Sequence, residues 1–268
     1  MDNKAFISIE GLSKTFHTNI GDVQAVNDVS FSLQKGSIVG LVGESGSGKT
    51  TLGRCILRLI EPSSGSVNLE GENLLKLSNR KLRDVRKRMQ IIFQDPFSSL
   101  NPEMSIGNSI IEPMIAHEIY KNDEERILKA FQLLEDVGLD KNDFSKYPSQ
   151  FSGGQRQRIV IARALSLNPR IVICDESVSA LDVSVQAQVL NLLNSLKEKF
   201  SFTFLLISHD LSVIRYMSDR VIILNKGTIE ECNETDKVFE NPIRHLSLIH
   251  ISEPTRRYAI SYAVFCLK

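Results

Sequence analysis

Residues 37–60, SIVGLVGESGSGKTTLGRCILRLI, carry the strongest structural signal in the chain. A buried strand is expected at Ser37 to Val42, and a helix is expected to run from the following loop to about Ile60. Between them, Gly43 to Thr50 fits the pattern G-x-x-x-x-G-K-[ST]. Glycines let the backbone wrap closely, so that its N–H groups can face phosphate oxygens. The stretch therefore predicts a phosphate-binding loop between a strand and a helix.

The loop also contains side chains suited to a nucleotide and its metal ion. Lys49 supplies a positive charge for β- and γ-phosphates, and the Thr50 hydroxyl is placed to ligate Mg²⁺. The helix that begins there adds the positive end of its dipole. A glycine-rich turn with an exposed lysine is the alternative, which the flanking strand and helix disfavour. We expect ATP to be bound by Gly43, Glu44, Ser45, Gly46, Ser47, Gly48, Lys49, Thr50 and Thr51.

A second candidate site lies at residues 171–176, IVICDE, where an apolar strand ends in two acids. Open α/β sheets bind ligands at the carboxyl ends of their strands. There Asp175 can bind the water shell of Mg²⁺, and Glu176 can polarise the attacking water. A solvated acidic strand end is the better interpretation of this segment in isolation, but the phosphate-binding loop elsewhere in the chain favours the catalytic one.

Residues 151–158, FSGGQRQR, place a serine and two glycines before a run of good helix formers, Gln155 to Leu165. This pattern predicts a second anion-binding helix N-terminus. One nucleotide does not need two such sites in one chain. The segment therefore indicates that Ser152, Gly153, Gly154 and Gln155 act on a nucleotide held by a partner subunit, although Ser-Gly-Gly alone is more often a simple helix start.

With these motifs in order, residues 5–240 resemble the ABC ATPase family. The resemblance implies an α/β fold: a P-loop NTPase (RecA-like) core with a mainly parallel sheet, an N-terminal antiparallel β subdomain and an inserted helical subdomain. The alternation of apolar runs with helical stretches independently predicts a mainly parallel sheet. We expect the ABC ATPase domain to span residues 1–245 and the helical subdomain about 97–166.

Further roles follow from the resemblance alone. Phe16 lies where the family stacks an aromatic ring on adenine, and Gln94 matches the glutamine that contacts Mg²⁺ or water. His209 matches the histidine that contacts the γ-phosphate, and Asp182 ends the loop that communicates across the dimer. The implied catalytic residues are Glu176, His209 and Gln94, and the implied Mg²⁺ ligands are Thr50, Gln94 and Asp175. Ser177 departs from the family, which commonly has proline there.

Narrower features resemble the peptide and nickel importer branch: QDPFSSLNP at 94–102, DVSVQAQ at 182–188 and NPIRH at 241–245. The resemblance implies a peripheral subunit on the cytoplasmic face of the cell membrane, hydrolysing ATP in a dimer. The implied partners are a paralogous or identical ATPase subunit, two transmembrane permeases and, indirectly, a substrate-binding protein. Nucleic acid is not expected as a partner, because 32 Lys and Arg balance 32 Asp and Glu.

Two other functional classes, a soluble ABC ATPase and a non-hydrolysing scaffold, fit the sequence less well. A soluble ABC ATPase acting in DNA repair or on ribosomes usually carries paired cassettes, zinc modules or long coiled coils, and the sequence shows none of these. A non-hydrolysing scaffold is disfavoured because Lys49, Asp175, Glu176 and His209 are all present. The cysteines lack CxxC spacing, and a reducing cytoplasm fits them best.

The end of the sequence is expected to have another origin. Leu246 to Arg256 and Ile260 to Lys268 resemble the two translated ends of a transposon-type sequencing-library adapter, separated by barcode length. We therefore expect 246–268 to be a sequencing-adapter artefact and not native protein. A genuine short amphipathic tail is the alternative, and an independent genomic clone of the locus distinguishes the two.

Overall fold

The computed structural model describes residues 5–19, 21–176 and 181–240. These residues divide into two compact units, the first containing residues up to Arg83 and from Thr203 onward, the second containing Asp84–Phe202. Ser177, the branch-like segment 241–245 and the adapter-like segment 246–268 lie outside the described residues.

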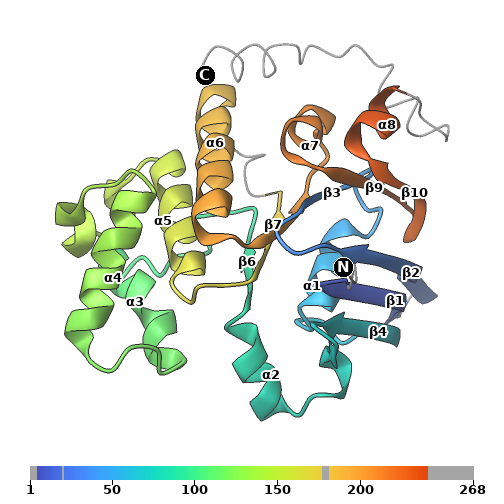
Figure 1. The fold of residues 1–268 in the computed structure, drawn as a ribbon, viewed down its shortest axis with the longest axis horizontal. Helices are drawn as coiled ribbons and strands as arrows, with labels where there is room; N and C mark the ends of the chain where they lie inside the picture. Colours follow the sequence, from blue (N-terminus) through green and yellow to red (C-terminus); the bar gives the residue numbers. More distant parts are fainter. Residues whose placement is uncertain (1–4, 20, 177–180, 241–268) are drawn as a thin grey trace. The chain divides into compact units, whose positions relative to one another are not determined.

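The strands described in the first unit belong to two sheets (Figure 1). One is antiparallel, in the order β2-β1-β4-β5. In the other, β3 pairs in parallel with both β8 and β9, and β9 pairs antiparallel with β10. The strands are β1 (Ile7–Thr18), β2 (Gly21–Leu33), β3 (Ile38–Val42), β4 (Ser64–Leu69), β5 (Glu72–Asn73), β8 (Thr203–Ile207), β9 (Arg220–Asn225) and β10 (Thr228–Glu234).

Helix α1 (Lys49–Ile56) joins the two sheets of this unit, because it contacts β1 and β2 of one and β8 of the other. Its apolar side chains Leu52, Cys55 and Ile56 are buried. Helix α7 (Leu211–Met217) packs on β3, and Figure 1 shows it on the other side of that strand from α1. The remaining helices are η1 (Leu74–Lys76), α8 (Thr235–Glu240) and α2 (Asn79–Arg86), which spans the boundary between the units.

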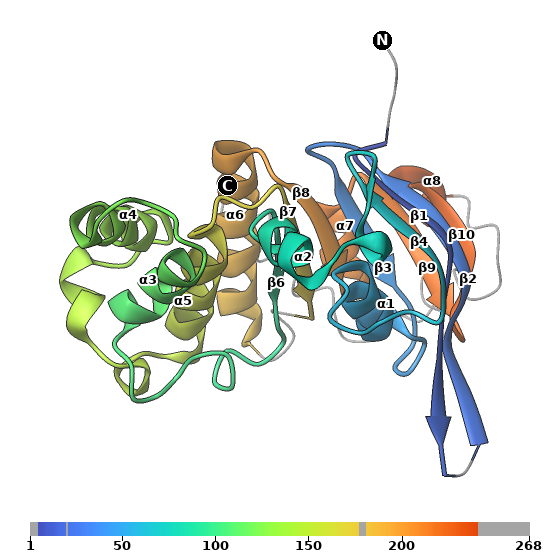
Figure 2. The same cartoon turned by 90° about the horizontal axis from the view of Figure 1, so that it is seen from below.

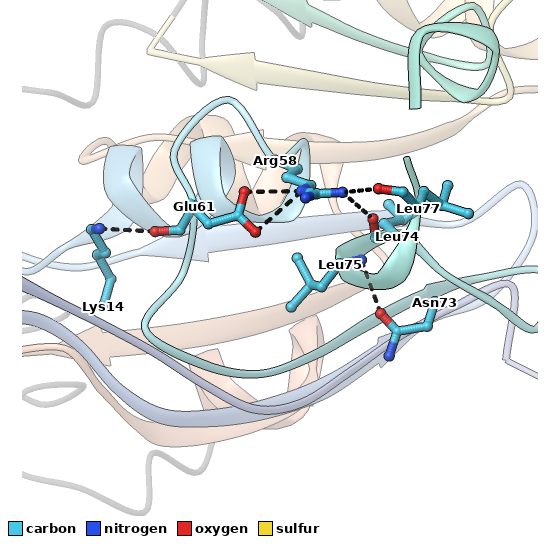
Figure 3. Close-up of polar contacts among 7 residues, drawn as sticks. All are labelled: Lys14, Arg58, Glu61, Asn73, Leu74, Leu75 and Leu77. Atoms are coloured by element: carbon cyan, nitrogen blue, oxygen red, sulfur yellow. Dashed lines mark hydrogen bonds and ion pairs between the residues drawn. The ribbon is translucent and has the colours of Figure 1, made fainter. Parts of the chain in front are cut away.

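A hydrogen-bond network secures the end of α1 (Figure 3). Arg58 donates from Nη1 to the main-chain oxygens of Leu74 at 2.9 Å and Leu77 at 2.8 Å. Its Nε lies 2.9 Å from the Glu61 carboxylate. Lys14 of β1 donates from Nζ to the main-chain oxygen of Glu61 at 2.8 Å. The network thus ties β1, the end of α1 and the segment around η1 to one another.

The second unit is organised around α5 (Figure 2). This helix contacts α3, α4, α6 and strand β6, and most of its side chains from Ile159 to Leu165 are buried. Strands β6 and β7 pair in parallel, with Ile92 opposite Cys174. The elements are β6 (Met89–Ile92), β7 (Ile171–Asp175), α3 (Ile106–Ala116), α4 (Asp123–Asp136), η2 (Lys141–Ser145), η3 (Pro148–Gln150), α5 (Gly153–Leu165) and α6 (Val183–Phe200).

This architecture agrees with the predicted fold class. The parallel pairs β3–β8, β3–β9 and β6–β7 form the expected α/β core, and the sheet of β1, β2, β4 and β5 is the expected antiparallel one. The helix expected to reach about Ile60 is shorter, since α1 ends at Ile56 and Arg58 adopts a left-handed φ of 49°. Across the described ranges, every helix is too short or too polar to cross a bilayer.

Candidate active site

The loop between β3 and α1 folds around the side chain of Lys49. Its Nζ donates to the main-chain oxygens of Gly43 at 2.8 Å and Glu44 at 2.9 Å. Only 5% of Lys49 is exposed, so its charge is held inside the loop. Glu44, Ser45 and Gly46 at the crest of the loop are exposed. The predicted loop residues therefore form a single structure with a positive charge at its centre.

Because Gly48 has no side chain, the loop can pack closely against the main chain of β2 at Ala25. It adopts φ +102°, and a Cβ placed there would lie 2.1 Å from the main-chain oxygen of Ala25. Gly48 is also the N-cap of α1, where it offers no side-chain hydrogen bond to the first turn. The N-terminal end of α1 therefore presents its positive dipole without a side-chain cap.

The loop is held in place by a contact that the sequence pattern did not indicate. The main-chain oxygen of Ser47 accepts a hydrogen bond from Gly227 N at 2.9 Å, and Gly227 O accepts one from Asn27 N at 2.8 Å. These residues come from β2 and the β9–β10 turn, which are distant in sequence. No local motif marks Gly227 or Asn27, so only the folded chain reveals their part.

His209 follows β8 at the same sheet edge as the loop, because Ser208 N donates to Leu41 O of β3 at 3.1 Å. Its side chain is exposed between two buried neighbours, Ser208 and Asp210. Asp210 is the N-cap of α7 and accepts from Ser212 N at 2.9 Å. His209 is thus an exposed residue whose backbone is fixed by the start of α7.

Phe16 lies in β1 with its ring half-buried. It pairs with Val23 of β2, whose side chain is 53% exposed, and Lys14 Nζ lies 5.0 Å from the ring centroid. The ring therefore keeps an accessible part next to an apolar neighbour. Such a surface suits stacking against a flat base, which stays a prediction.

In the second unit, the acids and Gln94 share one strand edge. Asp175 ends β7 and is only 5% exposed, and the half-buried Glu176 follows with a left-handed φ of 50°. Because Ile92 and Cys174 are paired in parallel strands, the residues that follow each strand leave at the same edge. Gln94 is exposed there. The structure thus brings Gln94, Asp175 and Glu176 to one edge, and their catalytic and Mg²⁺-binding roles stay predictions.

The predicted trans-acting segment is the N-terminus of α5, closed by a reciprocal capping box. Ser152 Oγ accepts from Gln155 N at 3.3 Å, and Gln155 Oε1 accepts from Ser152 N at 2.9 Å. Both residues are exposed. Gly154 packs closely on the start of α6, since a Cβ there would lie 2.4 Å from Val185 Cγ1. Asp182, the N-cap of α6, is exposed beside this contact.

Similarity to known proteins identifies the family. The profile described as ABC transporter matches residues 26–179. The oligopeptide transport ATP-binding protein AppF of Bacillus subtilis (strain 168) is 50% identical over 232 residues, covering 86% of this chain and 70% of that protein. OppF of the same organism, also an oligopeptide transport ATP-binding protein, is 46% identical over 254 residues, covering 92% and 83%. The chain belongs to the ABC transporter family.

A solved ABC cassette supports the same assignment at the level of the fold. The dimeric structure of a post-hydrolysis state of the ATP-binding cassette MJ0796, bound to ADP and Pi, superposes with a TM-score of 0.76 at 29% identity. The match covers 85% of this chain and 98% of that one. Together with the sequence relatives, it confirms the predicted ABC ATPase fold and the resemblance to the peptide importer branch.

The loop of this ABC cassette fits the triphosphate of a nucleotide. Ser47 Oγ is buried and has no hydrogen-bond partner among the described residues. Ser47 directly precedes Gly48, the N-cap of α1, and an anionic oxygen bound at this helix N-terminus would satisfy its hydroxyl. An ammonium, a helix N-terminus and an unsatisfied hydroxyl are donors suited to phosphate, and the Thr50 hydroxyl is a hard oxygen ligand suited to Mg²⁺.

Proposed function

We propose that this chain is the ATP-hydrolysing subunit of a transporter that takes up peptides. The observation that carries the proposal is the presence of two helix N-termini suited to phosphate in one chain, at α1 and α5. Because a nucleotide needs only one of them from the same chain, the second is available to a nucleotide on a partner. The oligopeptide relatives AppF and OppF favour peptides over nickel as the solute.

The proposed reaction is hydrolysis of the γ-phosphate of ATP in a dimer. Lys49 and the amides of residues 43–51 bind the phosphates, and Phe16 stacks on adenine. Mg²⁺, held by Thr50, Gln94 and Asp175, supplies charge neutralisation when bound. Glu176 orients and polarises the attacking water as general base, while His209 donates a hydrogen bond to the γ-phosphate.

The partner subunit completes the site in this proposal. The first-turn amides of α5, with the Ser152 hydroxyl and Gln155, face the γ-phosphate held by the other subunit, and Asp182 lies next to them at the dimer contact. Hydrolysis then requires that the two chains close on each other. Two permeases and a substrate-binding protein complete the importer, with this chain peripheral on the cytoplasmic face.

A surface in the second unit is suited to receive a permease. An open pocket of about 620 Å³ is lined by Asn101, Glu103, Met104, Ser105, Asn108, Phe144, Ser145 and Tyr147. One of the lining residues, Tyr147, is 47% exposed. We place the cytoplasmic helices of the permeases here, within the helical subdomain proposed at about 97–166 of an ATPase domain spanning 1–245.

The test is ATP hydrolysis by the chain alone and with the neighbouring ATPase and permease subunits in liposomes, with and without a peptide-loaded binding protein. Turnover should rise on assembly and again with peptide, and Glu176→Gln should bind ATP without turnover. Turnover indifferent to the permeases would favour a soluble ABC role and overturn the proposal. Stimulation by nickel in place of peptide would overturn the choice of solute.

A further inference from the structure

Two arginines on one face of α5 hold the turn that follows Gln94. The guanidinium carbon of Arg156 lies 4.2 Å from the centroid of the Phe97 ring. Arg163, at i+7 and hence on the same face, donates from Nη1 to Ser99 O at 2.7 Å. The helix that begins at the trans-acting segment therefore contacts residues 95–99, defined here as the Gln94 turn, at two separate points.

The Gln94 turn is itself preorganised. Asp95 Oδ1 accepts from Phe97 N at 2.8 Å, and Ser99 Oγ donates to Asp95 O at 2.7 Å. The backbone hydrogen bond from Phe97 lowers the pKa of the Asp95 carboxyl. These hydrogen bonds link Phe97 and Ser99 to Asp95, the residue next to Gln94, so we expect a displacement of Phe97 to be passed to Asp95.

The Phe97 ring is not held in place by surrounding core side chains, because 61% of the residue is exposed. The ring lies against the Arg156 guanidinium, and such cation–π contacts contribute about 0.5–1 kcal/mol at exposed sites. The same guanidinium donates from Nε to Pro148 O at 2.7 Å. Arg156 therefore spans from the Gln94 turn to η3, the segment that leads into Ser152.

Arg163, the second arginine that contacts the Gln94 turn, also has a partner on a neighbouring helix. Arg163 Nη2 lies 3.0 Å from Glu112 Oε2 on α3, so the second arginine is held between the Gln94 turn and a neighbouring helix. Arg156 lies in the first turns of α5, close to the capping box of Ser152 and Gln155. The Arg156 side chain therefore connects Phe97 with the N-terminus of α5.

We propose that Phe97 and Arg156 are positioning residues that couple the exposed Gln94 turn to the trans-acting N-terminus of α5. The inference rests on the proposed function, since it assumes that a permease loads this face and that α5 serves a nucleotide on the partner. A partner pressing on Phe97 shifts the Arg156 guanidinium, and with it the Pro148 carbonyl and the Ser152 cap. Neither residue touches the reacting atoms; both act through α5.

The test uses the assembled transporter with Arg156→Gln, Phe97→Leu and the double variant. Each single variant should lower peptide-stimulated kcat about tenfold and leave KM for ATP within about twofold, because the phosphate-binding loop is untouched. The double variant should be no worse than either single one, as expected for residues acting as one link. Arg156→Lys should restore part of the stimulation, because an ammonium retains the attraction to the ring.

The matched control is Arg215→Gln, which removes an arginine 5.4 Å from the centroid of the Phe239 ring in the first unit. It should leave stimulation within about twofold of the original chain. Additive losses in the double variant, or unchanged stimulation in both single variants, would overturn the proposed coupling. An equal loss in the Arg215 control would show a general effect of removing such contacts and would also overturn it.

A second measurement separates this inference from the proposed function. In the isolated full chain, hydrogen exchange at the Gln155 amide reports the Ser152 cap, because that amide donates to Ser152 Oγ. Phe97→Leu should speed this exchange about fivefold, and adding Arg156→Gln should not speed it further. Unchanged exchange would refute the link. If the original complex shows no permease stimulation, the proposed function fails, while the exchange result still decides the link.

Discussion

At the scale of single residues, Gln157 stands out within α5. It is fully buried, and neither Nε2 nor Oε1 has a hydrogen-bond partner among the described residues. A buried amide without partners costs about 1–3 kcal/mol relative to an apolar side chain of similar shape. We expect Gln157→Met to raise the free energy of unfolding by about 1–2 kcal/mol in urea titrations.

The comparison for this prediction is Gln90→Met in β6. Gln90 Nε2 donates to Arg86 O at 2.8 Å and Met89 O at 3.0 Å, so its loss should lower stability by about 1 kcal/mol. We expect Gln157→Met to raise the free energy of unfolding and Gln90→Met to lower it. If Gln157→Met were as destabilising as Gln90→Met, the Gln157 amide would have partners in solution.

Cys55 gives a pH-dependent prediction. Its thiol is buried in α1, and desolvation raises its pKa from 9.0 to about 11. At pH 8 only about 0.1% of such thiols are ionised, against about 10% in the unfolded chain. Alkylation of Cys55 should therefore be at least about 100-fold slower in the folded protein, and should accelerate as the pH rises toward 11. Peptide mapping by mass spectrometry measures both rates; equal rates would contradict the burial of the thiol.

At the scale of elements, the end of α1 depends on Arg58 (Figure 3). Its guanidinium satisfies the carbonyls of Leu74 and Leu77 with only 14% of the side chain exposed. Arg58→Met leaves both carbonyls without this donor and should cost about 2–3 kcal/mol of stability. Lys14→Met removes one exposed hydrogen bond of the same network and should cost less than about 1 kcal/mol. Thermal unfolding of the two variants checks the ranking.

Elements set by local patterns could be predicted, and elements set by distant contacts could not. β3 and β7 are short apolar runs, and the sequence places each of them within a residue or two. The polar half of β1, up to Thr18, has no apolar alternation; pairing of Phe16 with Val23 and Thr18 with Gly21 makes it a strand.

The same distinction holds within the site. Spacing placed the phosphate-binding loop, the acids of β7 and the helix start at Ser152, because each motif is contiguous. It could not place Gly227 against Ser47 or Arg156 over Phe97, since those contacts join segments whose proximity only the fold creates. The apolar pattern likewise continued past Ile56, where the Arg58 hydrogen bonds turn the chain away from helix.

At the scale of the whole molecule, the proposed active site needs two chains, and Gly153 offers a way to test this without disturbing the fold. A Cβ at Gly153 would meet only Leu181 Cδ2 at 3.7 Å, an ordinary contact. An aspartate there lies in the first turn of α5, where a negative charge stabilises a helix by about 0.3–1 kcal/mol. Gly153→Asp should therefore fold with an unchanged or slightly higher melting temperature.

The catalytic effect should be the opposite, because the same charge would face the γ-phosphate of the partner's nucleotide. ATP affinity of the isolated Gly153→Asp chain should stay within about twofold of the original, while turnover in the assembled transporter should fall more than about tenfold. Vanadate-trapped nucleotide should then disappear from the partner ATPase and remain on this chain. Lys49→Ala should give the reverse pattern, since it removes this chain's own phosphate-binding loop.

Gly154→Ala separates damage to the fold from damage to catalysis. Its Cβ would lie 2.4 Å from Val185 Cγ1, so it should lower the melting temperature as well as turnover. Gly153→Asp should lower turnover alone. If Gly153→Asp weakened ATP binding by the isolated chain as much as Lys49→Ala does, the N-terminus of α5 would serve the chain's own nucleotide. The second helix N-terminus would then give no reason for a dimer, because one chain would use both.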